Sequence, residues 1–472
     1  MRKYLLFFLC SLLCYIVQAK DKAPKWTKKV GAEKLKFKKT VFYVNAYGAL
    51  PDGKTLNTAA IQKAIDDCAA KGGGIVSFKE GKYLSGAIFL KDGVNLQINT
   101  GVEILGSQDI KDFPEIDSRI AGIEMRWPAA LINIIGKKNA AVTGNGIVNA
   151  QGKAYWDYYW NLRKEYEPKG LRWIVDYDAK RPRTFLVQES SNILLKGPVF
   201  QQAGFWTVQV LYSNHVTIDG ITIQNNIGGH GPSTDGIDID SSSWVLVQNS
   251  DIDCNDDDFC LKSGRDSDGL RVNRPTEYVL IQNCVARSGA GLITLGSETS
   301  GGIRHVLARN LKGKGTSNGL NIKSATTRGG TIEDIHFQDS ELENVGVMLR
   351  VNMNWNPTYS YSTLPEGYSM ETIPAHWKVM LTKVEPAEKG IPVFKDVHVS
   401  NIKVTGARQA AIAAEGIKES SLKGFTLKNI VVTDAAKAGT VRYAEDWTVE
   451  NVDIKATDNS KVVIRDSKNV GF

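Results

Sequence analysis

Acidic side chains gather in two short stretches of the chain. Asp235, Asp238 and Asp240 lie within six residues, and Asn255-Asp256-Asp257-Asp258 follows, with Asp256 placed 21 residues after Asp235. Carboxylates that share one site repel one another when ionised, which raises the pKa of at least one of them. A carboxyl group of raised pKa is what a general acid requires near neutral pH. One carboxyl that protonates a leaving oxygen and another that activates water are the usual equipment for glycoside hydrolysis.

Calcium binding is the alternative interpretation of the same residues. Turns rich in aspartate bind this ion through oxygen ligands. Residue types and spacing favour catalysis but leave the alternative open.

A repeated unit shows how the chain positions these acids. In each copy two apolar residues flank one position, and Gly, Asn or Asp follows two residues later; from residue 193 onward the period is about 22–34 residues with one interval of 62. The alternation predicts a short strand, and the terminal Gly or Asn favours a turn. Such units bury their apolar faces only when they stack, which predicts a parallel β-helix. A β-propeller and a leucine-rich horseshoe fit the period and composition less well. The copies begin at residues 140, 193, 216, 245, 279, 306, 335, 397, 425 and 447.

One helix is expected before the repeats. Ile61, Ala64, Ile65 and Cys68 have helical spacing, and Gly72-Gly73-Gly74 ends the pattern. We expect this helix to cap the open end of the solenoid.

Two aromatic-rich stretches interrupt the repeats, residues 152–184 and 351–378. We expect loops that leave the solenoid. Their aromatic side chains suit both sugar stacking and packing of the loops on the coils, and the sequence does not decide between the two.

The N-terminal residues indicate export. Residues 1–19 place Arg2 and Lys3 before an apolar run too short to span a membrane and end in Ala19, as a signal peptide does. Residues 20–472 would then form a single catalytic domain, secreted or periplasmic. Lipid attachment at Cys14 is the less favoured alternative, because the residues before it are not those that lipoprotein processing prefers.

The remaining cysteines and the net charge give weaker constraints. Cys68, Cys254, Cys260 and Cys284 have no zinc-site spacing, so one disulfide or buried thiols are both open. The formal charge of +7 becomes +5 without the two basic residues of the predicted signal peptide. This mild excess fits an acidic partner such as a polyuronide, whereas no basic-aromatic motif indicates nucleic acid.

The order of several short motifs resembles that of a known family. Thr234-Asp235-Gly236 is followed by Asp256-Asp257, Gly289-Ala290-Gly291 and Asn321-Ile322-Lys323. Polygalacturonases and their relatives in glycoside hydrolase family 28 read Asn-Thr-Asp, Asp-Asp, Gly-His-Gly and Arg-Ile-Lys in this order. The likeness covers most of the chain, starting at Ala46-Tyr-Gly48. It implies a right-handed parallel β-helix, in agreement with the repeats.

The resemblance also implies roles for individual residues. Asp256 would be the general acid, and Asp235 and Asp257 would hold and deprotonate the water of a single-displacement, inverting reaction. Lys323 would bind a uronate carboxylate beside the scissile bond, a contact that suits its point charge. We add Asp238 and Arg328 as candidate substrate-binding residues. This scheme requires no metal and no cofactor.

Three positions depart from the family motifs. Ser233 replaces Asn, Ala290 stands in place of His, and Asn321 stands in place of Arg, which removes a bidentate carboxylate contact. Asn321 stays a candidate binding residue. His230, in its own Gly229-His-Gly231, is a candidate to return an imidazole to the site, although an ordinary loop histidine is the favoured interpretation.

Three functions remain in competition. The first is a hydrolase of α-galacturonosyl linkages in pectin, the second a calcium-dependent polysaccharide lyase, and the third a non-catalytic glycan-binding β-helix. The hydrolase is favoured because Asp235, Asp256, Asp257 and Lys323 occur together. The missing Arg favours a neutral sugar on one side of the bond, and hence rhamnogalacturonan-type or substituted pectin over homogalacturonan. We expect a pectic polysaccharide or oligosaccharide as the partner, no membrane span, and a monomer.

Overall fold

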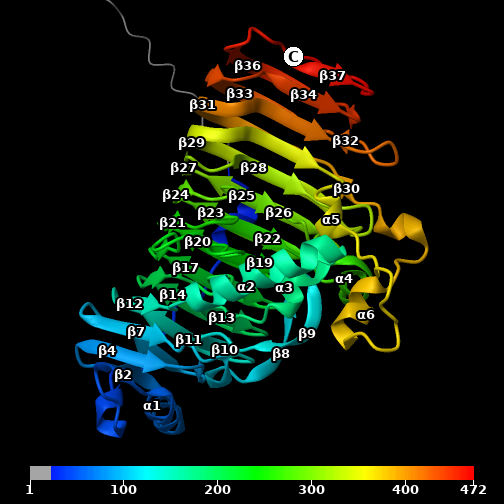
Figure 1. Cartoon of the computed structure of the whole chain (residues 1–472). Coiled ribbons are helices and arrows are strands. Elements are labelled where there is room, and N and C mark those ends of the chain that lie inside the picture. Colours follow the sequence, from blue (N-terminus) through cyan, green and yellow to red (C-terminus); the bar gives the residue numbers. More distant parts are fainter. Residues whose placement is uncertain (1–22) are drawn as a thin grey trace, which may run out of the picture.

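The computed structural model describes residues 23–472, and the predicted signal peptide and Cys14 lie outside this range. The described chain forms a right-handed parallel β-helix, seen in Figure 1 as a column of stacked strands. This confirms the fold expected from the repeats. Each coil supplies one short strand to each of three parallel sheets. Strands pair in register with the next coil, as Val216 with Val245 and Val245 with Val279.

The first sheet carries the acidic motifs. It comprises β5 (Ile88–Phe89), β10 (Ile132–Ile135), β13 (Phe185–Gln188), β16 (Val208–Leu211), β19 (Ile237–Asp240), β22 (Phe259–Lys262), β25 (Ile293–Leu295), β28 (Asn318–Lys323), β34 (Gly439–Arg442), β37 (Val463–Arg465) and the C-terminal parts of the long strands β29 (Thr331–Asn352) and β31 (Val397–Glu415).

The other two sheets complete each coil, and the N-terminal and middle parts of β29 and β31 belong to them in addition to the strands below. The second comprises β1 (Val41–Tyr43), β3 (Gly74–Ser77), β6 (Val94–Gln97), β11 (Lys138–Thr143), β14 (Ser191–Lys196), β17 (Asn214–Asp219), β20 (Ser243–Gln248), β23 (Thr276–Gln282), β26 (Ile303–Arg309), β30 (Val393–Phe394), β33 (Thr426–Ala435) and β36 (Thr448–Ala456). The third comprises β2 (Asp52–Leu56), β4 (Gly81–Ser85), β7 (Val102–Gly106), β12 (Ile147–Asn149), β15 (Val199–Gln201), β18 (Thr222–Gln224), β21 (Asp251–Asp253), β24 (Val285–Ser288) and β27 (Lys312–Lys314). An antiparallel hairpin, β8 (Glu115–Ile120) and β9 (Ile123–Pro128), and a short pair, β32 (Leu422–Lys423) and β35 (Ala444–Glu445), lie outside them.

The repeated apolar positions form the continuous core. Ile218, Val247 and Ile281 occupy equivalent positions on successive coils and are fully buried. Burying each such side chain contributes about 1.5–3 kcal/mol. The turn prediction also holds, because Asn283 and Asn310 end their units with φ of 58° and 52°, in the left-handed region. The side-chain amide of Asn310 donates to Oδ1 of Asn283 at 2.6 Å, so these turns stack as the strands do.

The helix α1 (Thr58–Ala70) covers the N-terminal end of the column (Figure 1). Ile61, Ala64, Ile65 and Cys68 are completely buried on its inner face. The spacing therefore predicted both the helix and the face that it buries.

The two interruptions are not the plain loops that the sequence suggested. The first contains α2 (Lys153–Tyr166) and α3 (Val175–Asp178), and the second contains α5 (Pro357–Ser360) and α6 (Ala375–Leu381). A further helix, α4 (Asp266–Val272), follows β22. In Figure 1 these helices lie together on one side of the column. The sequence analysis missed these helices because their apolar residues pack against one another and do not follow the repeated pattern of the coils.

Aromatic contacts join the two insertions. The rings of Trp173 and Trp377 meet edge to face with centroids 5.5 Å apart. Asp178 accepts hydrogen bonds from His376 Nε2 at 2.5 Å and Trp377 Nε1 at 3.0 Å. Most of the large rings in this region are buried, so packing explains them better than sugar stacking does. The buried rings include Tyr155, Trp156, Tyr159, Trp173, Tyr177 and Trp377.

The four cysteines of the described chain are free thiols, and all are buried. This supports the buried-thiol interpretation over a disulfide. Within residues 23–472 no helix is long and apolar enough to cross a membrane.

Candidate active site

Three carboxylates meet on the outer side of the first sheet. Asp235 precedes β19, and Asp256 and Asp257 precede β22, one coil further along. Because Ile237 pairs with Phe259, the two stretches lie side by side at the spacing of paired strands. Each of the three acids presents an oxygen within 4.8 Å of the others. The structure thus brings together the residues that the sequence selected as catalytic.

A tight turn makes both neighbouring acids face the same site. The backbone N–H of Asp257 donates to Oδ1 of Asp256 at 3.0 Å, and the Cys254 thiol donates to the carbonyl of Asp256 at 3.1 Å. Asp258 is fully buried, and the Cys254 thiol lies 3.4 Å from its Oδ1. The turn therefore supplies the bend that an ideal strand lacks, with Asp256 and Asp257 outward and Asp258 inward.

A cavity of about 80 Å³ opens at the carboxylates. Asp256 is partly exposed in it, whereas Asp235 and Asp257 are 3% and 1% exposed. The remaining walls come from the first sheet, its turns and the two insertions. They are formed by Ala121, Arg172, Asp176, Phe205, Trp206, Ser233, Lys262, Ser297, Glu298, Lys323, Trp355 and Tyr359.

Asp257 is held on both sides. Lys323 Nζ lies 2.8 Å from Oδ2 of Asp257, and the Thr294 hydroxyl donates to its Oδ1 at 2.7 Å. The ammonium of Lys323 also lies 4.5 Å from the centre of the Trp355 ring. Burial alone would lower the pKa of Lys323, but Asp257 and Asp256 outweigh it and raise this pKa. Lys323 is therefore a fixed cation at the wall of the cavity.

The other two acids of the trio hold protons more tightly than free aspartates. Burial, followed by repulsion from Asp257, raises the pKa of Asp256. Burial, followed by repulsion from Asp238 and Asp256, raises the pKa of Asp235 well above its ordinary value. These are the shifts that suit a general acid and a strengthened base.

Two charged residues of the site were missed by the sequence analysis. Lys262, at the end of β22, lies with Nζ 3.6 Å from Asp235, 3.5 Å from Asp238 and 3.4 Å from Glu298. Burial would raise the pKa of Glu298, but Lys262, then Arg328 and Lys323, lower it to about 2. The signal in the sequence was weak, because Lys262 ends its strand at a position where Asp240, its partner on the preceding coil, is also charged. Neither residue has a partner nearby in sequence, so only the fold reveals the cluster.

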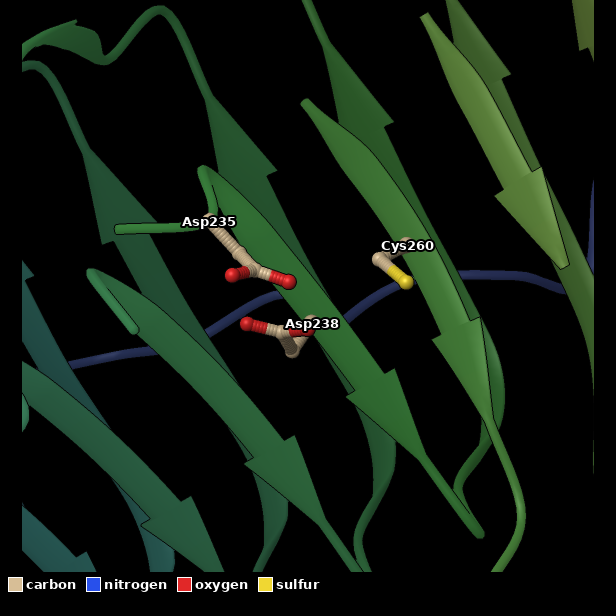
Figure 2. A group of neighbouring side chains, drawn as sticks. All are labelled: Asp235, Asp238 and Cys260. Atoms are coloured by element: carbon tan, nitrogen blue, oxygen red, sulfur yellow. The ribbon is translucent and has the colours of Figure 1, made fainter. Parts of the chain in front are cut away.

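The group Asp235, Asp238 and Cys260 has ligand atoms within 4.8 Å of one another (Figure 2). Its chemistry fits a metal ion poorly. Lys262 already places an ammonium 3.5–3.6 Å from both carboxylates. Burial also raises the pKa of the Cys260 thiol well above its ordinary value, which disfavours the thiolate that a metal would need. Metal-independence stays a prediction.

Four candidate binding residues lie away from the cavity wall: three are buried side chains, and the fourth, His230, lies in a loop. Asp238 is completely buried beneath Asp235. Asn321 is 4% exposed, and its side chain lies 3.5 Å from the Thr294 hydroxyl. Arg328 is fully buried, pairs with Asp266 at 2.5 Å and donates to the carbonyl of Ser297 at 3.2 Å. These three residues support the site from behind, and their direct contact with substrate stays a prediction.

His230 does not return an imidazole to the site. It is exposed in the loop before Ser233, and its carbonyl accepts a long hydrogen bond of 3.4 Å from Trp160. Ser233 itself donates to Asp176 at 2.9 Å. His230 is thus the loop histidine that the sequence analysis favoured.

We expect Glu298 to make the protein acid-sensitive. Its pKa is about 2 in the folded state against an ordinary 4.5, so its stabilisation is complete above pH 4.5 and is lost as the pH falls toward 2. The full shift corresponds to about 3 kcal/mol. Urea unfolding at pH 3 and pH 6 should show a smaller difference in the free energy of unfolding for Glu298→Gln than for the wild type. Equal differences would contradict this role.

The sequence matches known proteins over most of its length. Residues 77–371 match the family model described as glycosyl hydrolases family 28, and residues 41–109 match one described as rhamnogalacturonase A/epimerase, pectate lyase-like. A probable polygalacturonase of Vitis vinifera is 27% identical over 418 residues, which cover 86% of this chain and 76% of that protein. An exo-poly-alpha-D-galacturonosidase of Dickeya chrysanthemi is 27% identical over 65% of this chain and 55% of its own length.

Solved structures show the same fold. The hyperthermoactive exopolygalacturonase of Thermotoga maritima superposes with a TM-score of 0.72 at 23% identity, covering 90% of this chain and 96% of its own. The family 28 exopolygalacturonase of Yersinia enterocolitica gives 0.74 at 23% identity, covering 92% and 78%.

Proposed function

The chain belongs to glycosyl hydrolases family 28, and from that premise we propose that it cleaves α-galacturonosyl linkages of pectic polysaccharide by inverting hydrolysis. It is a glycoside hydrolase with polygalacturonase relatives. The observation that carries the proposal is the trio Asp235, Asp256 and Asp257, whose carboxylate oxygens lie within 4.8 Å of one another at the cavity.

Each residue of the trio has a distinct role. Asp256 is the most exposed of the three and has a raised pKa, so it donates the proton to the leaving oxygen. Asp235 accepts a proton from the attacking water. Asp257 pairs with Lys323 and orients that water through the lone pairs left free by Lys323 and Thr294. Lys323 has further N–H groups for a substrate carboxylate.

The short separation of the carboxylates does not by itself favour inversion. Inverting enzymes usually separate their two carboxyl groups by about 6.5–9.5 Å and retaining enzymes by about 5–5.5 Å. Single displacement is supported instead by the poor access to the candidate nucleophiles. Asp257 is 1% exposed with both oxygens engaged by Lys323 and Thr294, and Asp235 is 3% exposed. Proton NMR of the first product anomer tests this step, and a retained anomer would contradict it.

The insertions support cleavage from a chain end. Arg172 and Asp176 come from the first insertion and Trp355 and Tyr359 from the second, and all four line the cavity. The two insertions are joined through Trp173 and Trp377. A small cavity walled in this way suits a chain end better than the middle of a polymer. We therefore expect release of short products without an early fall in viscosity.

The charges of the cavity support a neutral sugar on one side of the bond. Lys323 pairs with Asp257, Arg172 pairs with Asp176, and Lys262 lies among three carboxylates. Little positive charge remains for two uronate carboxylates. This agrees with the departures at Ala290 and Asn321, and we keep rhamnogalacturonan-type or substituted pectin as the favoured substrate over homogalacturonan.

Product analysis tests substrate and mode of action together. Homogalacturonan, rhamnogalacturonan and substituted pectic fragments are incubated with the enzyme, and reducing ends, product lengths and viscosity are followed. Faster hydrolysis of unsubstituted polygalacturonate than of rhamnogalacturonan fragments would overturn the substrate preference. Release of no reducing ends from any pectic polymer would favour a glycan-binding protein.

We predict activity that does not depend on a metal. Carboxyl groups acting through water need no Lewis acid, and Lys262 supplies the cation beside Asp235 and Asp238. Turnover in EDTA should equal turnover in added calcium. If EDTA abolished activity, calcium restored it and the product were unsaturated, the protein would be a polysaccharide lyase.

Export of the protein, with residues 1–19 as a signal peptide, is also part of the proposal. N-terminal sequencing of the mature protein tests it, with Lys20 expected as the first residue.

A further inference from the structure

We propose that Lys262 and Asp238 are positioning residues that control the charge on Asp235, Lys262 favouring and Asp238 opposing its ionised form, with Glu298 holding Lys262 in place. This rests on the proposed role of Asp235 as the base. It assigns a task to two buried groups that the catalytic steps do not use.

The geometry commits Lys262 to the carboxylates around it. The side chain is 6% exposed at the wall of the cavity, and its ammonium lies 4.8 Å from the centre of the Trp206 ring. Its other neighbours include the carboxylates of Asp235, Asp238 and Glu298 at 3.4–3.6 Å. An ammonium between an aromatic ring and three acids acts chiefly through the acids that it contacts.

Glu298 fixes the position of this ammonium. It is 3% exposed, and its neighbouring charges are Lys262, Arg328, Lys323 and Arg265. Because these cations lower the pKa of Glu298 to about 2, its carboxylate is ionised near neutral pH. Lys262 is therefore anchored to one permanent anion, and its remaining charge acts on Asp235 and Asp238.

Asp238 acts on Asp235 in the opposite sense. It is completely buried one strand position beneath the cavity, and neither of its oxygens has a hydrogen-bond partner within the described chain. In Figure 2 its carboxyl group lies beside that of Asp235. Two carboxyls this close resist double ionisation. In agreement, burial, Asp238 and Asp256 raise the pKa of Asp235, while Lys262 lowers it.

The charged groups around the pair come from several coils. Asp235 is faced by Asp238, Lys262, Arg181, the acids Asp256 and Asp257 of the next coil, and the thiols of Cys254 and Cys260. Asp238 is faced by Lys262, Asp257, Glu298, Asp240 and Arg183. Lys262 and Asp238 are the charged side chains that lie within 4.8 Å of the Asp235 carboxylate without taking part in the reaction, so substitutions there should move the pKa of Asp235 in opposite directions.

The test compares two substitutions in one pH profile. In Lys262→Met the acid limb of kcat/KM should move to higher pH by about one to three units, and in Asp238→Asn it should move to lower pH. Lys262→Arg keeps the cation and should restore the limb toward the wild type. Asp258→Asn is the matched control, because this acid is equally buried but does not contact Lys262, and it should leave the limb unchanged. Shifts of both variants in the same direction, or no shift, would overturn the proposal.

A second readout separates this proposal from the proposed function. Carbon-13 NMR titration of the aspartate carboxyls, with the Asp235 signal assigned from its loss in Asp235→Asn, needs no substrate. The pKa of Asp235 measured in this titration should rise in Lys262→Met and fall in Asp238→Asn. If the wild type hydrolyses no pectic substrate yet these shifts occur, the function is wrong and the coupling stands. If hydrolysis occurs without the shifts, the coupling is wrong.

Discussion

Replacing Asp256 with asparagine should lower kcat by about 10²–10⁴-fold, the usual contribution of general acid catalysis. The amide keeps the volume of the side chain and the hydrogen bond from the Asp257 N–H, but it has no acidic proton to give to the leaving oxygen. The thermal midpoint should stay close to that of the wild type. Initial rates on a substrate with an ordinary sugar leaving group measure the effect.

A matched control separates the acid from its neighbour. Asp258 lies two residues away, is buried in the coil interior and contacts Cys254, not the cavity. Asp258→Asn makes the same chemical change and should keep most of the turnover. Near wild-type turnover in Asp256→Asn, or an equal loss in the control, would refute the assignment of Asp256.

Replacing Asp235 with asparagine should abolish most turnover and at the same time stabilise the protein. The amide cannot accept the proton of water, which costs about 10²–10⁴-fold in kcat. Burial and like charges raise the pKa of Asp235 in the folded state. As the pH rises above its ordinary pKa of about 4, the unfolded chain releases the proton more readily than the folded chain, so Asp235 destabilises the fold progressively.

The gain in stability should therefore grow with pH. Thermal unfolding of Asp235→Asn and wild type is compared at pH 4 and pH 7, and the difference in midpoint should be larger at pH 7. This is the behaviour of an active-site group kept for function at the expense of stability. A variant that is less stable than the wild type at pH 7 would show that Asp235 holds the turn together instead.

The exposed loop of His230 illustrates one limit of reading a site from the sequence. His230 lies five residues before Asp235, which made it a candidate to replace a missing imidazole. In the structure the loop turns it outward to solvent, while Ser233 bonds to Asp176 from an insertion 57 residues earlier. Closeness in sequence therefore did not predict closeness to the carboxylates, because the loop before β19 leaves His230 exposed and outside the cavity wall.

The sequence by itself determined the solenoid and the acids of the candidate active site. Alternating apolar residues that end in Asn or Gly specify a strand and a turn locally, and stacking then follows because each coil has the same interior positions. Asp235 and Asp256 are one coil apart, so the period alone placed them side by side.

The tertiary structure decided the features that arise from contacts between different coils and insertions. Lys262 acquires its function from Asp235, Asp238 and Glu298, which lie up to 36 residues away on neighbouring coils. The cavity takes its walls from insertions that meet through Trp173 and Trp377, about 200 residues apart in the chain. Burial and neighbouring charges at these contacts set the pKa of each titratable group in the site. Both depend on three-dimensional neighbours, which local patterns do not encode.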